Sequence, residues 1–170
     1  PYPSESFWRQ ATLFTDFRAC TGPCKTRTEV RLCYDDTFLY LNWRCEEPQT
    51  GKLRCWHTQT LGKACRRPLS GVGYAYPSIS SRDDYVQLLL DAQHDRKRYF
   101  EILVNPLGHI HTASGIATKY ELDCSPQWKC RGLRAQARIG DGAWSADMAI
   151  PFAALGVRDV EVGRSFGINL

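Results

Sequence analysis

Alternation of apolar and polar residues with a period of two constrains this chain more than any other feature of its sequence. The alternation runs through residues 133–139 and again through 144–150, and Asp141-Gly142 stands between the two stretches. Asp-Gly is a strong signal for a two-residue hairpin turn, because a type I′ turn needs positive φ at both central positions. In this register every apolar residue of one face lies opposite another apolar residue. The predicted pairs are Gly140–Ala143, Ile139–Trp144, Ala137–Ala146, Ala135–Met148 and Gln136–Asp147.

The same period predicts more strands elsewhere in the chain. A second hairpin is expected over 29–45, with its turn at Asp35-Asp36-Thr37. Trp43 and Trp144 fall on apolar strand faces and are expected in the core, and so is Trp8. The remaining predicted strands are 84–91, 98–104, 109–113 and 166–170.

Helix is nearly absent from the pattern. Pro151 suits the first helical position and Gly156 suits a helix stop, so at most one short helix is expected, near 151–155. Many short strands with regular turns predict an all-β fold, an antiparallel β-sandwich. The length of 170 residues fits a single domain, 1–170. The long irregular segment 46–82 has a length that is usually functional or internally stapled.

Eight cysteines point to an oxidising compartment, because reducing compartments disfavour disulfides. Zinc is the alternative, but its sites favour two pairs of ligands spaced by roughly two to four residues. Only Cys20 and Cys24 are that close together. The chain is therefore predicted to be disulfide-braced and secreted, or extracellular at a cell surface. The spacings suggest Cys55–Cys65 and Cys124–Cys130 bridges, and the other pairings stay open.

Charge and hydropathy argue against two classes of partner. The formal net charge is +4, and the short clusters Arg66-Arg67 and Arg96-Lys97-Arg98 do not make the basic stripe typical of nucleic-acid binders. No apolar run approaches the roughly 18 residues that a membrane span needs. The first residues lack the pattern of a signal peptide, so the chain is expected to be a mature or excised piece.

Five blocks of sequence follow one another in a characteristic order. They are residues 29–40 with Asp35-Asp36, 82–86 with Asp83-Asp84, 104–108 with Asn105-Pro106-Leu107-Gly108, 144–156, and 166–169. In order and spacing these blocks resemble the family 9 carbohydrate-binding module and its wider DOMON-type relatives. The resemblance covers most of the chain.

The resemblance implies a non-catalytic, lectin-like β-sandwich that binds a polysaccharide or other glycan. It also implies attachment to other domains of a larger secreted protein, and a structural calcium ion. Family members clamp a sugar between two tryptophans, since aromatic faces pack on the apolar face of a pyranose while amides, carboxylates and Arg bind its hydroxyls. This chain has Ser80-Ser81 where the first tryptophan would lie, Gln87 at the sugar-contacting Glu, and Leu103 at the contacting Arg.

Loop aromatics and nearby polar residues are the candidate sugar contacts. Trp56 is either a binding platform or is buried over the sheet, and Tyr74 or Tyr76 can replace the missing tryptophan. Trp128, between two cysteines, either contacts ligand or packs on a disulfide. The candidate carbohydrate-binding residues are Trp56, Tyr74, Tyr76, Arg82, Asp84, Gln87 and Trp128.

Metal ligands cannot be named from the sequence. Asp83 and Asp84 have three open interpretations, as turn formers, calcium ligands or sugar acceptors. Asp35-Asp36 is more simply a turn. His109 and His111 alternate along a strand, and we expect them as surface polar residues rather than as a metal site.

Catalysis and haem binding are not expected. Glu101, Asp84 and Asp147 are carboxylates of the type that glycosidases use in pairs, but nothing in the sequence brings two of them together. The only methionine, Met148, falls where an apolar face requires a hydrophobe, which argues against a haem ligand. Two hypotheses remain: a glycan-binding module, and a structural or protein-interaction sandwich that has lost its sugar site.

Overall fold

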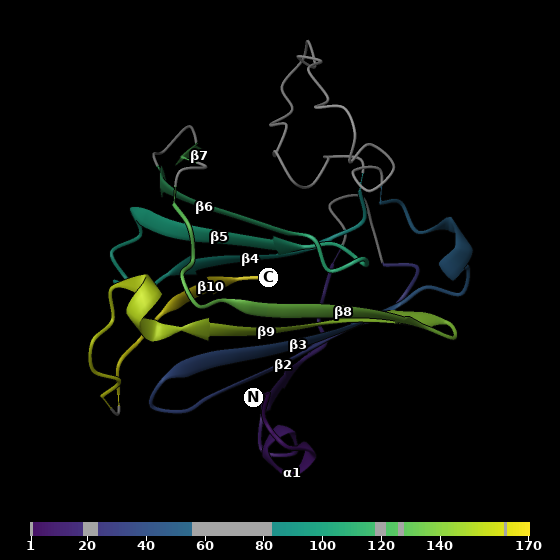
Figure 1. Ribbon diagram of the computed structural model, residues 1–170, viewed down its shortest axis with the longest axis horizontal. Coiled ribbons are helices and arrows are strands. Elements are labelled where there is room, and N and C mark those ends of the chain that lie inside the picture. The colour runs from purple at the N-terminus through teal and green to yellow at the C-terminus, as the bar shows by residue number, and fades with distance from the viewer. Residues whose placement is uncertain (1, 19–23, 56–82, 118–121, 126–127, 162) are drawn as a thin grey trace. The chain divides into compact units, whose positions relative to one another are not determined.

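The computed structural model describes residues 2–18, 24–55, 83–117, 122–125, 128–161 and 163–170. The chain divides into two compact units, one formed by Pro1–Gly51 with Cys130–Arg164 and the other by Lys52–Lys129 with Ser165–Leu170. Each unit holds one five-stranded antiparallel sheet (Figure 1). Two antiparallel sheets with almost no helix confirm the predicted all-β sandwich class. The prediction of one domain stays a prediction.

The first sheet has the strand order β1-β2-β3-β9-β8. The hairpin of β8 and β9 turns at Asp141-Gly142, and all five predicted cross-strand pairs are present. Gly142 has a φ of +68°, in the left-handed region where glycine is favoured. The strands of this sheet are β1 Thr12–Phe14, β2 Thr28–Tyr34, β3 Phe38–Glu46, β8 Arg134–Gly140 and β9 Ala143–Pro151.

The turn between β2 and β3 is fixed by one carboxylate. Asp35 Oδ1 accepts hydrogen bonds from the backbone N–H groups of Thr37 and Phe38, each at 2.7 Å. Its Oδ2 accepts one from the hydroxyl of Tyr40 at 2.8 Å. These bonds hold the pKa of Asp35 below its usual value, although burial alone would raise it. Asp35 is therefore the turn former that the sequence predicts.

One face of the first sheet is an apolar core. Trp43 is 2% exposed and Trp144 is 5% exposed, as predicted from their place on apolar strand faces. Met148 is completely buried beside its strand partners Leu41 and Ala135. Other buried members of this face are Val30, Leu39, Ala146 and Ile150.

The second sheet has the strand order β10-β4-β5-β6-β7. Four of its strands match predicted segments, although β6 is longer than expected, and β7 has no counterpart among them. Val86, Leu88, Leu90 and Ile102 are buried on one face, as predicted. The strands are β4 Val86–Asp91, β5 Arg98–Val104, β6 Ile110–Ala117, β7 Leu122–Ser125 and β10 Gly167–Asn169.

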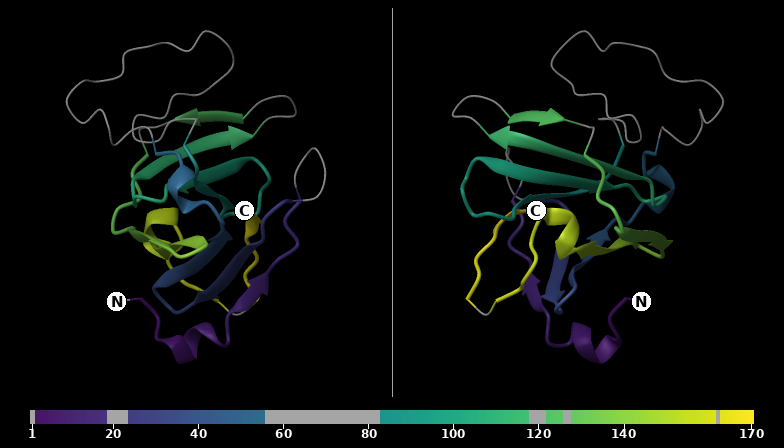
Figure 2. Two further views of the ribbon diagram at one scale, coloured as in Figure 1. Left: turned by 90° about the vertical axis from the view of Figure 1, so that its right-hand side faces the viewer. Right: turned by 60° about the vertical axis from the view of Figure 1, so that its left-hand side comes forward.

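The expectation of a single short helix is wrong. The predicted segment forms the 3-10 helix η3 (Phe152–Leu155), which ends at Gly156 with a φ of +72°. A second, unpredicted turn of helix, α1 (Glu5–Trp8), begins after Ser4, and a one-turn 3-10 helix η1 spans Thr50–Lys52. Trp8 lies in α1 and is half-buried, so its expected place in the core is also wrong. Figure 2 shows the N-terminal segment beside the β2–β3 hairpin. No helix in the described part of the chain is long and apolar enough to span a membrane.

Disulfide bracing is not supported. Cys24, Cys33, Cys45 and Cys130 are thiols, and no disulfide joins two cysteines of the described residues. Burial raises the pKa of the buried Cys130 thiol to about 11. The suggested Cys124–Cys130 bridge is therefore wrong in this structure, and the Cys55–Cys65 bridge involves residue 65, which lies outside the described residues.

Candidate functional site

Gln87, a predicted sugar contact, lies on the regular strand β4 of the second sheet. Gln87 pairs with Leu103 of β5, which in turn pairs with His111 of β6. The next row on the same face holds Leu89, Glu101 and Ala113. We call these six side chains the Gln87 face.

A carboxylate fixes the amide of Gln87. Gln87 Nε2 donates to Glu101 Oε1 at 2.5 Å. Glu101 is only 4% exposed, whereas Gln87 is half-buried. A contact this short to a buried side chain orients the amide. Gln87 keeps its own Oε1 and a second N–H for a ligand.

His111 lies on the same face and is 3% exposed, so the expectation of a surface histidine is wrong for this residue. Burial, assisted by the nearby positive charge of Lys129, lowers the pKa of His111 to about 4. The imidazole is therefore neutral near pH 7. A neutral imidazole has one donor and one acceptor nitrogen, the pattern of a sugar hydroxyl.

The centre of the Gln87 face is closed to solvent. Leu103 and Ala113 are 0% exposed, so the position that matches the family's arginine carries a buried hydrophobe. Gln87 and Leu89 are only half-buried. The accessible polar group of this face is thus the Gln87 amide.

Asp83 and Asp84 act as structural acceptors. Asn105 Nδ2 donates to Asp83 Oδ2 at 3.3 Å, and both residues are buried. The backbone N–H of Arg54 donates to Asp84 Oδ2 at 2.6 Å, while the Asp84 N–H donates to the Arg54 carbonyl at 2.8 Å. Asp84 is exposed beyond this contact. These bonds link segments 22 and 30 residues apart, so both carboxylates make tertiary contacts rather than local turns.

Trp128 lies on the opposite side of the sheet from Gln87. Its ring contacts Phe100, with ring centroids 4.6 Å apart, and its carbonyl accepts a hydrogen bond from Thr112 Oγ1 at 3.0 Å. Phe100 pairs with Leu90 and shares the face of Leu88, whereas Gln87 points the other way. Trp128 and Gln87 therefore do not share one site on the sheet.

Four predicted contacts, Trp56, Tyr74, Tyr76 and Arg82, lie outside the described residues. The structure thus places Gln87 in β4 and Asp84 two residues before that strand, with Trp128 on the other side of the sheet from Gln87. Sequence reasoning missed that Glu101 bonds to Gln87 and that His111 lies on the same face. The sequence signal for Glu101 was a charged residue within the apolar stretch Phe100–Val104, whereas His111 has polar neighbours in β6 and gave no such signal.

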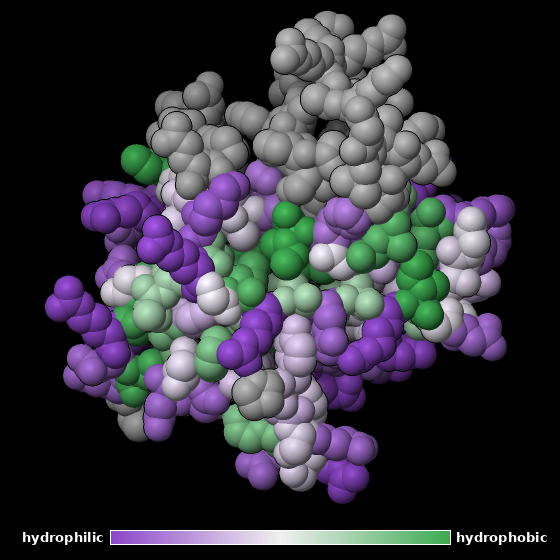
Figure 3. Space-filling model, viewed as in Figure 1, coloured by the Kyte–Doolittle hydropathy of each residue, from purple (hydrophilic) through white to green (hydrophobic). Residues whose placement is uncertain are grey.

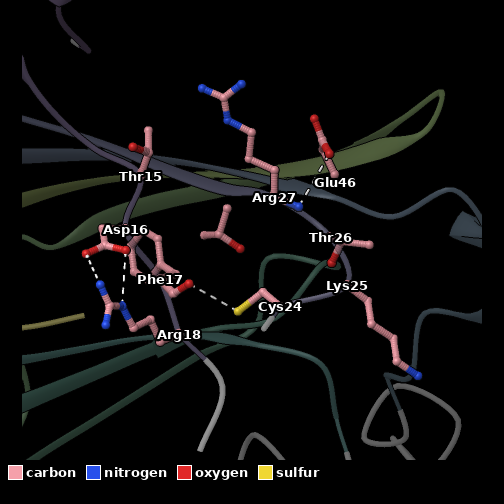
Figure 4. Close-up of a pocket in the computed structure, with 10 residues that line it drawn as sticks. Thr15, Asp16, Phe17, Arg18, Cys24, Lys25, Thr26, Arg27 and Glu46 are labelled. Atoms are coloured by element: carbon pink, nitrogen blue, oxygen red, sulfur yellow. Dashed lines mark hydrogen bonds and ion pairs between the residues drawn. The ribbon is translucent and has the colours of Figure 1, made fainter. Parts of the chain in front are cut away.

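A cavity in the first unit is lined by none of the predicted residues. It measures about 780 Å³, and Figure 4 shows that Asp16, Arg18, Cys24 and Arg27 line it. Arg18 pairs with Asp16 at 3.2 Å, and Cys24 Sγ donates to the Phe17 carbonyl at 3.2 Å. The polar groups of this cavity largely bond to one another. The cavity is therefore a weaker candidate for a ligand site than the Gln87 face.

A metal site does not emerge from the described side chains. Within that part of the chain, no three His, Cys, Asp or Glu side chains come together. Asp91 and Asp95, at the β4–β5 turn, accept hydrogen bonds from backbone N–H groups. These bonds commit oxygens of both carboxylates to the β4–β5 turn.

Solved carbohydrate-binding proteins share this fold. A "putative carbohydrate-binding protein" from Bacteroides uniformis has a TM-score of 0.63 and 14% identity, and the match covers 94% of this chain and 70% of that one.

The particular likeness is to carbohydrate-binding module family 9. The module from Caldicellulosiruptor kristjanssonii has been solved with cellotriose (TM-score 0.61, 13% identity) and with glucose (TM-score 0.62, 13% identity). These matches cover 96% and 98% of this chain but only 66% and 68% of the modules. The predicted family 9-like fold is thereby confirmed. No family model and no curated protein matches the chain.

Proposed function

We propose that this chain is a non-catalytic carbohydrate-binding module whose sugar site lies on the Gln87 face. The observation that carries the proposal is the likeness in fold, over 94–98% of the chain, to carbohydrate-binding proteins. One of these modules was solved with glucose and cellotriose, so β-linked glucose units are the ligands to test first. A fold alone does not fix function, so the residues of the site must be tested directly.

The Gln87 amide is the central hydrogen-bonding group of the proposed site. Its contact with Glu101 fixes its orientation before a sugar arrives, which lowers the entropic cost of binding. Glu101 is then a positioning residue, and Gln87 makes the contact to sugar hydroxyls. Trp56, Tyr74, Tyr76 and Arg82 complete the proposal as stacking and polar contacts, on the grounds of the sequence alone.

Absence of catalysis is part of the same proposal. Glu101 bonds to Gln87, and Asp84 bonds to the backbone of Arg54. Asp147 belongs to the other compact unit, where it accepts hydrogen bonds from Asn42, Gln136 and Arg138. Each of the three carboxylates thus has a structural task of its own.

The test is calorimetric titration of the protein with glucose and with cellotriose. We expect wild-type protein to bind at least one of them, and Gln87→Ala to weaken that binding by about tenfold, the effect of losing hydrogen bonds worth about 1.4 kcal/mol. Gln93→Ala is the matched control, because Gln93 is an exposed amide in the β4–β5 turn. Trp56→Ala tests the stacking contact in the same assay. An unchanged affinity in Gln87→Ala would move the site away from this face.

A second candidate function is a structural or protein-interaction sandwich that has lost its sugar site. The burial of Leu103, Ala113, Glu101 and His111 favours it, because only one polar side chain of the face stays accessible. Failure of glucose, cellotriose and a wider panel of plant, algal and animal glycans to bind would select this function.

Secretion, attachment to other domains and a structural calcium ion belong to the proposal as implications of the family resemblance. Calcium is tested by comparing the thermal midpoint after EDTA dialysis with the midpoint after calcium is restored. An unchanged midpoint would remove calcium from the proposal.

A further inference from the structure

A row of five side chains crosses the whole first sheet. Leu13, Arg31, Asn42, Asp147 and Gln136 come from five different strands, and each is paired with the next. Residues directly opposite one another share a face, so all five lie on the side away from Trp43. We call this set the polar row.

The N-terminal segment forms a cavity against one end of the polar row. Glu5, Trp8, Arg9 and Ala11 line it together with Leu13, Arg31 and Asn42, and its volume is about 530 Å³. Every lining residue belongs to one compact unit. The volume lies within the range of about 300–1,000 Å³ typical of small-ligand sites. At the lower end of the molecule in Figure 3, where α1 lies, hydrophobic and hydrophilic residues stand side by side.

The side-chain amide of Asn42, in the lining of this cavity, is held in place by hydrogen bonds. Asn42 Nδ2 donates to Asp147 Oδ1 at 2.6 Å. Asp147 is 8% exposed, and its other oxygen accepts from Gln136 at 2.9 Å and Arg138 at 3.2 Å. This network fixes the Asn42 side chain and commits one of its N–H groups. Asn42 is thereby pre-oriented, with its carbonyl oxygen available to accept from a ligand hydroxyl.

Arg31 supplies positive charge with most of its donors uncommitted. Its NH1 lies 3.9 Å from Glu29 Oε2, beyond hydrogen-bond distance, and its side chain is 36% exposed. Glu29 makes its short contact of 2.8 Å with Arg27 instead. Arg9, also in the lining, pairs with Glu5 only at 3.7 Å. Two guanidinium groups and one carboxylate leave the lining with a net positive charge.

Trp8 supplies an aromatic wall. Its indole is half-buried, so part of the ring stays accessible in the cavity. Aromatic faces suit the apolar face of a pyranose, and a planar guanidinium suits a carboxylate, which it can bind through two parallel hydrogen bonds. A ligand that satisfies both features is a sugar ring that bears a carboxylate.

We infer that this cavity is a second saccharide site, selective for a uronic acid residue of an oligosaccharide. Arg31 binds the carboxylate, Trp8 packs on the ring, and Asn42 binds a hydroxyl. All three side chains belong to the first compact unit, whereas Gln87 belongs to the second. The inference therefore does not depend on the sugar site proposed around Gln87.

The experiment is a titration of the full chain with trigalacturonic acid, monitored by tryptophan fluorescence and by calorimetry. Cellotriose is the neutral comparison. Wild-type protein is expected to bind trigalacturonic acid, and Arg31→Gln to weaken this binding about tenfold or more, as expected for loss of charge-assisted hydrogen bonds. Arg31→Lys keeps the charge but loses the paired donors, so an intermediate loss is expected. Trp8→Ala is expected to weaken binding and to remove the fluorescence change.

Arg44→Gln is the matched control, since Arg44 follows Asn42 on the same face, is 47% exposed and does not line the cavity. Gln87→Ala separates the two sites: it is expected to leave trigalacturonic acid binding intact, even if it abolishes cellotriose binding. Equal thermal midpoints for wild type and Arg31→Lys show that a loss of affinity is not a loss of fold. The inference is overturned if wild-type protein does not bind trigalacturonic acid, if Arg31→Gln and Arg44→Gln weaken it equally, or if cellotriose binds the cavity as tightly.

Discussion

The two sheets differ in how they treat their second face. In the first sheet, one face is a core around Trp43 and Leu41, and the other carries the polar row. In the second sheet, Leu88 and Ile102 are buried on one face, and Leu103 is just as buried on the other. Alternation with a period of two therefore has two meanings in this chain. It separates an apolar core from a largely polar face in the first sheet, whereas in the second it separates two buried faces.

The difference explains why the polar groups of the two sheets behave differently. Asp147 collects three donors on the polar face, where long side chains extend toward it from neighbouring strands. Glu101 and His111 lie among buried hydrophobes, where a charge is costly and the pKa of His111 falls to about 4. His111 is therefore neutral on the Gln87 face, whereas Asp147 on the polar face pairs with Arg138.

The largest effect should come from truncating either buried face of the second sheet. Leu103→Ala is expected to cost about 2–5 kcal/mol of unfolding free energy, as is Leu88→Ala on the opposite face, because each leaves a cavity. Leu13→Ala on the polar face of the first sheet, where Leu13 is 46% exposed, should cost less than about 1 kcal/mol. Urea denaturation followed by circular dichroism measures all three. If Leu103→Ala resembles Leu13→Ala, the Gln87 face is not a second core and the comparison fails.

A smaller loss is expected at the centre of the polar row. Asp147→Ala removes the shared acceptor of Asn42, Gln136 and Arg138, and should lower the unfolding free energy by about 1–3 kcal/mol. Asp147→Asn keeps one acceptor oxygen and should cost less. Asp159→Ala, an exposed carboxylate in the same unit, serves as the control. Equal stabilities of Asp147→Ala and Asp159→Ala would mean that the network does not organise this face.

The subtlest test is the pH dependence of stability. The pKa of His111 is about 4 in the folded chain and about 6.5 in the unfolded chain, so between these values only the unfolded chain takes up the proton. Stability is therefore expected to fall as the pH drops from about 6.5 to about 4. His111→Gln should flatten this part of the profile, measured as urea midpoints across the pH range. Identical slopes in both proteins would show that His111 is not buried as a neutral group.

The sequence predicts local geometry well wherever neighbouring residues decide it. The Asp141-Gly142 turn fixes the register of β8 and β9, and Asp35 makes its own turn, because both depend on nearby backbone and side chains. The single turn α1 escaped prediction because four residues carry no helical period. The sequence therefore predicts Trp8 in the core, whereas the structure places it half-buried in the lining of a cavity.

The candidate site was harder to predict for a different reason. Alternation places Gln87, Glu101 and His111 on faces of their own strands, but the register between β4, β5 and β6 decides that these faces coincide. Burial of His111 depends on everything that surrounds the sheet, which no local pattern encodes. Trp128 shows the same limit, since its loop position did not reveal that it packs on Phe100 rather than near Gln87.

The pairing of β3 with β9 has a consequence for how the chain folds. Asn42 and Asp147 are neighbours in space but 105 residues apart in sequence, and the entire second sheet except β10 is encoded between them. During synthesis the β2–β3 hairpin emerges long before its partner strand β9. Until β9 is made, the exposed Trp43 makes the hairpin prone to aggregation. Such long-range closure slows folding, so we expect a slow refolding phase and a need for chaperone protection that a β-meander of the same size would not have.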